Sequence, residues 1–283
     1  MKLFASLIAL GLMACAVAES APAPTLSAPT AATMTFGQSF TLDSRILSET
    51  RRINVYTPPG YAEHPEARLP VIYMPDGGMA EDFPHVVEAV DALVGWGSMR
   101  PVIVVGIENT QRRRDLTGPT DVDSDKKIAP VVGGSAAYRQ FIRRELMPQI
   151  RSRFRTTDET AVMGESLAGL FVVETLELEP DLFDTYIAFS PSLWWNHDGN
   201  VQSFAAHLKA LPAGHKTFYM TSADEDNIAP EAAQIADMLR AAAPANLSWH
   251  YQPMPQEFHD TIYRASAPRA LRTLFAPKPK AAS

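Results

Sequence analysis

The chain has 283 residues, a formal net charge of −7 and a single cysteine, Cys15. An acidic chain without a basic patch argues against a nucleic-acid partner. Because the one cysteine lies close to the N-terminus, the sequence offers no disulfide framework, no cysteine metal site and no cysteine nucleophile to a folded domain. The length that remains is sufficient for one large hydrophobic core.

Residues 1–18 have the pattern of an export signal. Lys2 precedes an apolar stretch, and Ala16-Val-Ala18 ends in a small-x-small cleavage pattern. The apolar stretch is too short for a convincing membrane span. An alternative is that Leu12-Met-Ala-Cys15 is a bacterial lipoprotein cleavage box, with a lipid anchor on Cys15 as the membrane contact. Both interpretations predict an exported protein, either periplasmic or secreted.

Residues 19–35 are rich in Ala, Pro, Ser and Thr, which predicts a flexible linker. A folded domain is expected over 36–276, followed by a basic tail at 277–283. The apolar patterns predict strands at 39–46, 52–56, 69–74, 101–106, 160–164, 183–189, 216–221 and 247–252, and helices at 83–96, 136–154, 167–176, 231–243 and 261–275. Pro148 should interrupt the second helix. This alternation predicts an α/β fold with a mostly parallel central sheet flanked by helices.

The sequence Gly164-Glu-Ser166-Leu-Ala168 follows a short apolar run and precedes a helical pattern. That context is typical of a nucleophile elbow, the strand-to-helix turn that presents the catalytic serine of an α/β-hydrolase. The turn is tight, so the residues two before and two after the serine must be small. Ala168 replaces the usual glycine and is still small. Ser166 is therefore the candidate nucleophile.

A nucleophilic serine needs a base and an acid, which follow it in the order acid, then histidine, in this fold. His250 falls inside the last predicted strand, whereas His259 follows that strand in a loop, where a base can reach the site. Imidazole titrates close to neutral pH and suits this role. The acid should follow the strand at 216–221, where spacing alone does not separate Asp224, Glu225 and Asp226.

Backbone N–H groups of an α/β-hydrolase hold the oxyanion that forms during ester cleavage. One donor is expected from the loop after the strand at 69–74, at Gly78 or Gly77. The other is expected from Leu167, the residue after the serine. An ordinary strand-end turn is the alternative for the glycines.

The long polar loop at 107–134 carries Arg112, Arg113 and Arg114. Loops of this length inside a compact domain are often functional. The arginines could bind an anionic ligand, or they could pair with Asp115 and other nearby acids. Two further aromatic residues, Trp194 and Trp195, could form a wall beside the site or pack in the core.

The chain resembles a family of esterases among the α/β-hydrolases that includes siderophore esterases of the enterobactin, salmochelin and bacillibactin type. The resemblance covers roughly 36–275. It rests on Val71-Ile-Tyr-Met-Pro-Asp-Gly-Gly78, on Val105-Gly-Ile-Glu-Asn-Thr-Gln-Arg-Arg-Arg-Asp-Leu-Thr117, on the elbow, on Tyr186-Ile-Ala-Phe-Ser-Pro-Ser-Leu-Trp-Trp195 and on His259.

This resemblance implies that Ser166 and His259 are catalytic, and it favours Glu225 as the acid. It implies a serine hydrolase that cleaves carboxylic esters without a metal or organic cofactor. The expected partner is a small-molecule ester such as a ferric siderophore, with Arg112, Arg114, Trp194 and Trp195 binding an aromatic, anionic substrate. Alternatives are a feruloyl- or acetyl-type polysaccharide esterase, an acyltransferase, or a binding protein that uses the fold as a scaffold.

Overall fold

The computed structural model describes residues 32–34, 37–129 and 131–277. The predicted export signal at 1–18, with Cys15, and tail residues 278–283 lie outside these ranges. Within the predicted linker, β1 (Ala32–Met34) pairs with the next strand. Among the described residues, no helix is long and apolar enough to cross a bilayer.

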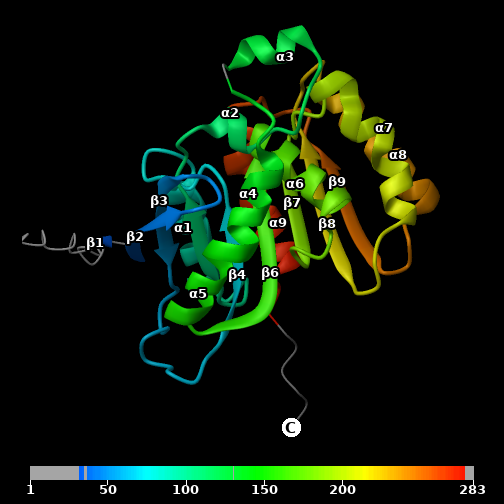
Figure 1. Cartoon of the computed structure of the whole chain (residues 1–283). Coiled ribbons are helices and arrows are strands. Elements are labelled where there is room, and N and C mark those ends of the chain that lie inside the picture. The colour runs from blue at the N-terminus through cyan, green and yellow to red at the C-terminus, as the bar shows by residue number, and fades with distance from the viewer. Residues whose placement is uncertain (1–31, 35–36, 130, 278–283) are drawn as a thin grey trace, which may run out of the picture.

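The described strands form one sheet in the order β1-β2-β3-β5-β4-β6-β7-β8-β9 (Figure 1). Their bounds are β2 (Gly37–Ser44), β3 (Glu49–Tyr56), β4 (Leu69–Met74), β5 (Ile103–Ile107), β6 (Thr156–Glu165), β7 (Thr185–Phe189), β8 (Lys216–Ser222) and β9 (Leu247–Pro253). The pairs from β1 to β5 are antiparallel, and those from β5 to β9 are parallel. This confirms the expected mostly parallel sheet.

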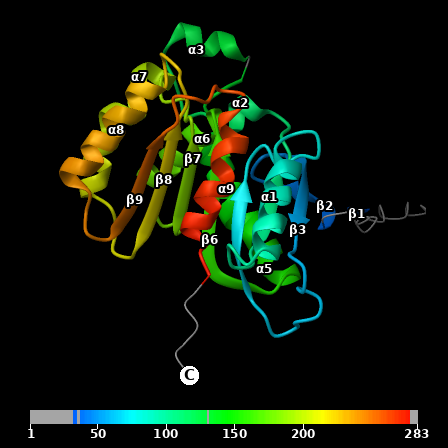
Figure 2. The ribbon, with the colours of Figure 1, turned by 180° about the vertical axis from the view of Figure 1, so that it is seen from behind.

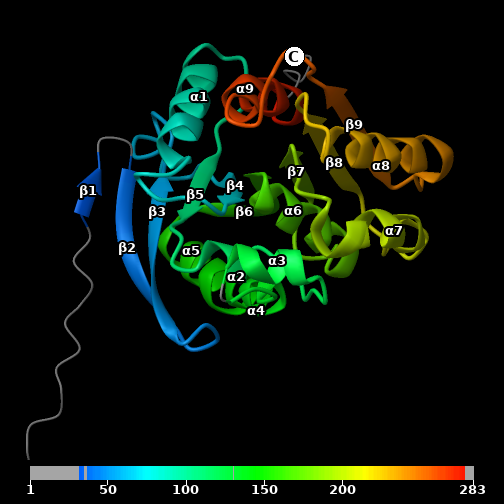
Figure 3. The ribbon, with the colours of Figure 1, turned by 90° about the horizontal axis from the view of Figure 1, so that it is seen from above.

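Helices cover both faces of the sheet, which is why the central strands are continuous apolar runs. On one face lie α1 (Phe83–Gly95) and α9 (Ile262–Leu274), in front of the sheet in Figure 2. On the other face lie α4 (Ser135–Phe141), α5 (Met147–Arg153), α6 (Leu167–Leu178), α7 (Trp195–Lys209) and α8 (Ala229–Ala242), and Figure 3 shows the layers from above. The strand order and layering are those of an α/β-hydrolase, as predicted.

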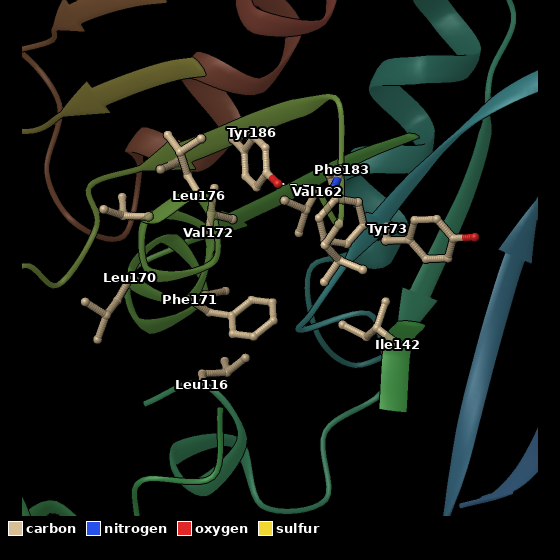
Figure 4. Close-up of a cluster of buried hydrophobic side chains, with 14 of the residues drawn as sticks. Tyr73, Leu116, Ile142, Val162, Leu170, Phe171, Val172, Leu176, Phe183 and Tyr186 are labelled. Carbon is tan, nitrogen blue, oxygen red and sulfur yellow. Dashed lines mark hydrogen bonds between the residues drawn. The ribbon is translucent and has the colours of Figure 1, made fainter. Parts of the chain in front are cut away.

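The larger core cluster fixes α6, the helix that follows the candidate nucleophile. Its side chains Phe171 and Val172 are fully buried with Val162 of β6 and Tyr186 of β7 (Figure 4). Burying side chains of this size stabilises the fold by roughly 1.5–3 kcal/mol each. The position of the strand-to-helix turn is therefore determined by packing on both sides of it.

The expected interruption at Pro148 takes the form of a π-helical turn, η1 (Ile142–Leu146), between α4 and α5. Proline lacks an N–H group and clashes with the carbonyl one turn earlier. Widening that turn keeps the chain helical, with the proline in the first turn of α5.

Three helices were not expected from the sequence. Two short ones, α2 (Arg112–Asp115) and α3 (Asp123–Ile128), lie in the segment predicted as a loop. The third, α7, begins with Trp-Asn-His-Asp-Gly-Asn, and the φ angles of Asn196, His197 and Asp198 are 52°, 53° and 57°. After these left-handed residues the buried side chains Val201, Phe204 and Leu208 do have helical spacing, so this helix was visible in the sequence.

Candidate active site

Ser166 lies between β6 and α6 with φ 60° and ψ −120°, a conformation outside the usual regions for a residue with a side chain. A Cβ atom on Gly164 would lie 2.5 Å from the Cβ of Ala168. Such an atom would also lie 2.8 Å from the backbone carbonyl carbon of Ala168, so position 164 requires glycine whichever small residue stands at position 168. The N–H of Ser166 donates to the carbonyl of Phe189 at 3.0 Å, and this bond ties the turn to β7.

His259 lies in the loop between β9 and α9 and contacts two groups through its two ring nitrogens. Its Nε2 is 2.9 Å from Oγ of Ser166. Its Nδ1 is 2.5 Å from Oε2 of Glu225, in the loop after β8. The Glu225 carboxylate beside Nδ1 favours the tautomer with its proton on Nδ1, which leaves Nε2 free to accept the serine proton.

The other candidates for base and acid are placed elsewhere. His250 is an exposed residue within β9, beside the ring of Tyr219. Asp224 and Asp226 are exposed, whereas the Glu225 side chain is 12% exposed. Of the three acids that the spacing left open, the geometry brings Glu225 to the histidine.

Glu165 is a site residue that the sequence reasoning missed. Its Oε1 is 3.3 Å from Nε2 of His259, on the side of the ring that faces Ser166. Burial raises the pKa of Glu165 to about 9; Arg112 opposes this shift, and Asp82, Asp76 and Glu225 add to it. The signal was present in the elbow, because the residue before the serine is a carboxylic acid.

The expected oxyanion donors differ in their surroundings. Leu167 is the first residue of α6, and the first N–H groups of a helix have no acceptor within it. The N–H of Gly78 instead donates to Oε2 of Glu81 at 2.7 Å, and that of Gly77 donates to the carbonyl of Ile107 at 3.0 Å. Contrary to the expectation, neither glycine presents a free donor. A substrate oxygen would have to displace the Glu81 carboxylate to reach Gly78.

Two arginines of the 107–134 segment, Arg112 and Arg114, have carboxylate partners, whereas Arg113 donates to the carbonyl of Ile128. Arg112 binds Asp76 through two hydrogen bonds of 2.6 and 2.8 Å. Arg114 binds Glu49 and Asp115, each at 2.7 Å. A cavity of about 490 Å³ adjoins these arginines, lined by Gln111, Arg112, Arg113, Arg114, Ala129 and Val131. The sequence left open that these arginines pair with nearby acids, and the structure shows such pairing for Arg114.

The two tryptophans have different environments. Trp195 is 2% exposed, and its Nε1–H donates to the carbonyl of Gly118 at 2.9 Å. It therefore belongs to the core and does not form the expected wall for a substrate. Trp194 is partly exposed and packs against Trp195 with ring centroids 6.0 Å apart. A neighbouring hydroxyl that the sequence did not suggest, Oγ of Ser192, lies 3.3 Å from Oγ of Ser166.

Comparisons with known proteins place this chain in a family. The model of the family described as "Putative esterase" matches residues 44–264, so the chain belongs to that family. The resemblance drawn from the sequence motifs is thereby confirmed.

Among curated proteins, the chain is 32% identical to the ferri-bacillibactin esterase BesA of Bacillus subtilis over 166 residues, which are 53% of this chain and 56% of that protein. It is 26% identical to the iron(III) salmochelin esterase of Escherichia coli O6:H1 over 164 residues, or 56% of this chain and 36% of that protein. The matched segments therefore span about half of the bacillibactin esterase and about a third of the salmochelin esterase. Carboxylic ester hydrolase, the expected class, is the class of these named relatives.

Among solved structures, an IroE-like serine hydrolase from Shewanella oneidensis has a TM-score of 0.77 and 28% identity, covering 84% of this chain and 80% of that one. The BES protein from Bacillus cereus has a TM-score of 0.75 and 22% identity, covering 88% and 98%. The second likeness is evidence for the shared fold.

Proposed function

We propose that the protein is an exported serine esterase that hydrolyses siderophore esters, with Ser166 as nucleophile, His259 as base and Glu225 as the acid of the triad. The observation that carries the proposal is the position of His259, whose two nitrogens contact Ser166 and Glu225. The esterases for bacillibactin and salmochelin among the relatives support the substrate class. Export rests on the signal pattern at 1–18.

In the proposed reaction, Oγ of Ser166 attacks the ester carbonyl carbon while Nε2 of His259 takes the hydroxyl proton. Glu225 stabilises the imidazolium through Nδ1. The tetrahedral oxyanion accepts a hydrogen bond from the N–H of Leu167, and the N–H of Gly78 joins it if Glu81 moves aside. Nε2 then gives its proton to the departing alcohol oxygen, which leaves an acyl-enzyme.

Water completes the cycle. His259 takes a proton from the water as the water oxygen attacks the acyl carbon. It then gives that proton to Oγ of Ser166 as the bond from Oγ to the acyl carbon breaks, which releases the acid product. These proton transfers need a histidine that is held on one side and reaches the serine on the other, which is the geometry observed.

The test combines turnover with covalent labelling. The purified protein should hydrolyse a p-nitrophenyl ester and a ferric catecholate siderophore ester, and a fluorophosphonate should label the peptide that contains Ser166, as identified by mass spectrometry. Labelling elsewhere would refute the assignment of the nucleophile. Good rates on feruloyl or acetyl esters, with none on siderophore esters, would move the substrate class to polysaccharide esters.

A further inference from the structure

The carboxyl group of Glu165 borders the reacting atoms without a role in the proposed triad. Its side chain is 14% exposed, and its Oε1 lies 3.3 Å from the same His259 nitrogen that contacts Ser166. That contact lacks hydrogen-bond geometry, so the buried Oε1 has no hydrogen-bond partner among the described residues. A buried acceptor without a partner is costly, and a positively charged group on the substrate would reduce that cost by electrostatic attraction.

The charged groups around Glu165 come from four separate segments and are mostly acidic. Asp76 follows β4, Asp82 precedes α1, Glu225 follows β8, Arg112 lies on α2 and His259 precedes α9.

Two basic side chains beside these acids, Arg112 and His85, each contact one of them. The Arg112 guanidinium is bound to both oxygens of Asp76. His85 lies 3.0 Å from Asp82. Arg112 therefore offsets an ionised Glu165 only in part, and acidic groups outnumber it around the candidate nucleophile.

We infer that Glu165 is a specificity-determining residue that favours esters with an ammonium or other cationic group close to the scissile carbonyl. This inference rests on the serine-esterase chemistry of the proposed function. The preference concerns only the atoms beside the scissile carbonyl, and the anionic ferric catecholate groups of a siderophore would lie farther from it. A substrate bound at Ser166 places its neighbouring atoms close to Glu165, because both residues contact one nitrogen of His259. A cation there would form a charge-assisted contact with the unpartnered oxygen, strengthened by its partial burial.

The preference should depend on pH in a definite direction. Because the pKa of Glu165 is raised to about 9, mainly by burial, its carboxyl is protonated at neutral pH in the free enzyme. A bound cation favours the ionised carboxylate, so binding releases a proton. Raising the pH toward 9 removes that step and should lower KM for a cationic ester relative to a neutral one.

The experiment compares two esters of the same acid that differ in charge and share one shape, a choline ester and its 3,3-dimethylbutyl ester. The ratio of their kcat/KM values is measured at pH 7 and pH about 9, the pKa of Glu165. In the wild type the ratio should favour the choline ester by about tenfold or more and should rise with pH. Glu165→Gln should remove both the preference and its pH dependence. The matched control is Glu63→Gln, which neutralises an exposed carboxylate.

Equal kcat/KM values for the two esters in the wild type, or a preference that survives in Glu165→Gln, would overturn the inference. Loss of both activities in the same proportion would also overturn it, because Glu165 would then act by positioning His259. Binding of the same esters to Ser166→Ala, measured by calorimetry, gives the charge preference without turnover. A failure of the proposed hydrolysis is thus distinguished from a failure of the charge preference.

Discussion

Two regions at the same end of the sheet are held in place by different forces. The turns that carry Ser166, Glu225 and His259 follow strands β6, β8 and β9, whose positions are set by parallel pairing. The segment at 108–134 has two short helices and is joined to the domain by ion pairs such as Arg112–Asp76. Buried strands therefore fix the candidate catalytic groups, whereas charge pairing fixes the arginines beside them.

The comparison suggests that the two regions respond differently to mutation. A change at the end of a buried strand should remove chemistry and leave the fold intact. A change in the arginine-bearing segment should alter stability or substrate charge preference, because Arg112, Arg114 and Asp115 are each paired with an opposite charge. The predictions below test this division, beginning with the largest expected effect.

The strongest test is Ser166→Ala. Hydrolysis of a p-nitrophenyl ester should fall by about a thousandfold or more, because the attacking atom is removed. Circular dichroism should show an intact fold, since the turn is set by packing around it. Ser192→Ala, which removes the neighbouring buried hydroxyl, should cost much less. A folded Ser166→Ala protein with most of its activity would contradict the assignment.

On the ion-paired side, Asp115→Asn should mainly reduce stability. Asp115 is 1% exposed and pairs with Arg51, which is fully buried, and with Arg114 at 2.7 Å. Removing its charge leaves the buried Arg51 with one carboxylate partner fewer, which should lower the free energy of unfolding by about 3 kcal/mol. Urea unfolding measures the loss, and Asp121→Asn, at an exposed position, is the control. An unfolding curve like that of the wild type would mean that charge pairing does not hold this segment.

A ranking of three acids tests the first region more finely. Glu225→Gln should lower kcat by on the order of a hundredfold, because an amide no longer stabilises the imidazolium form of His259. Asp224→Asn and Asp226→Asn should each have a smaller effect, since both residues are exposed. If either aspartate variant proved the more damaging, the acid of the triad would be that neighbour.

The difference between the two regions also explains which parts of the fold and of the candidate site the sequence could predict. Continuous apolar runs such as Ile103–Ile107 predict buried parallel strands, and the chain order of the fold then predicts where serine, acid and histidine lie. The spacing could not choose among the three acids, because a one-residue shift in a loop changes the direction of a side chain. Only the resemblance to known esterases favoured Glu225.

What the sequence missed depends on the conformation of loops and on contacts between distant segments. The bond from the N–H of Gly78 to Glu81 depends on the path of the turn after β4. The pairing of Arg112 with Asp76 joins residues that are 36 positions apart. No local pattern encodes either contact. Glu165 was visible in the elbow, but its contact with His259 required the fold.

The smallest expected effect concerns Arg112 and Arg114, which the sequence assigns to an anionic substrate. Arg112→Ala should raise KM for an anionic ester several-fold more than for a neutral one, because a lost charge-assisted contact matters only to the anion. The same substitution leaves the negative charge of Asp76 uncompensated beside Glu165. That charge would repel an anionic ester and raise its KM further. Arg114→Ala should change this ratio less, because Arg114 is bound to Glu49 and Asp115.

Arg112→Lys separates charge from geometry, because lysine keeps the positive charge but cannot bind both oxygens of Asp76 in the same plane. If charge alone matters, the lysine variant should behave as the wild type toward the anionic ester. Each KM is measured at two salt concentrations, since salt weakens an exposed contact more than a buried one. Equal increases in KM for both esters would show that Arg112 acts by holding Asp76, and the segment at 108–134 would then be structural at this position.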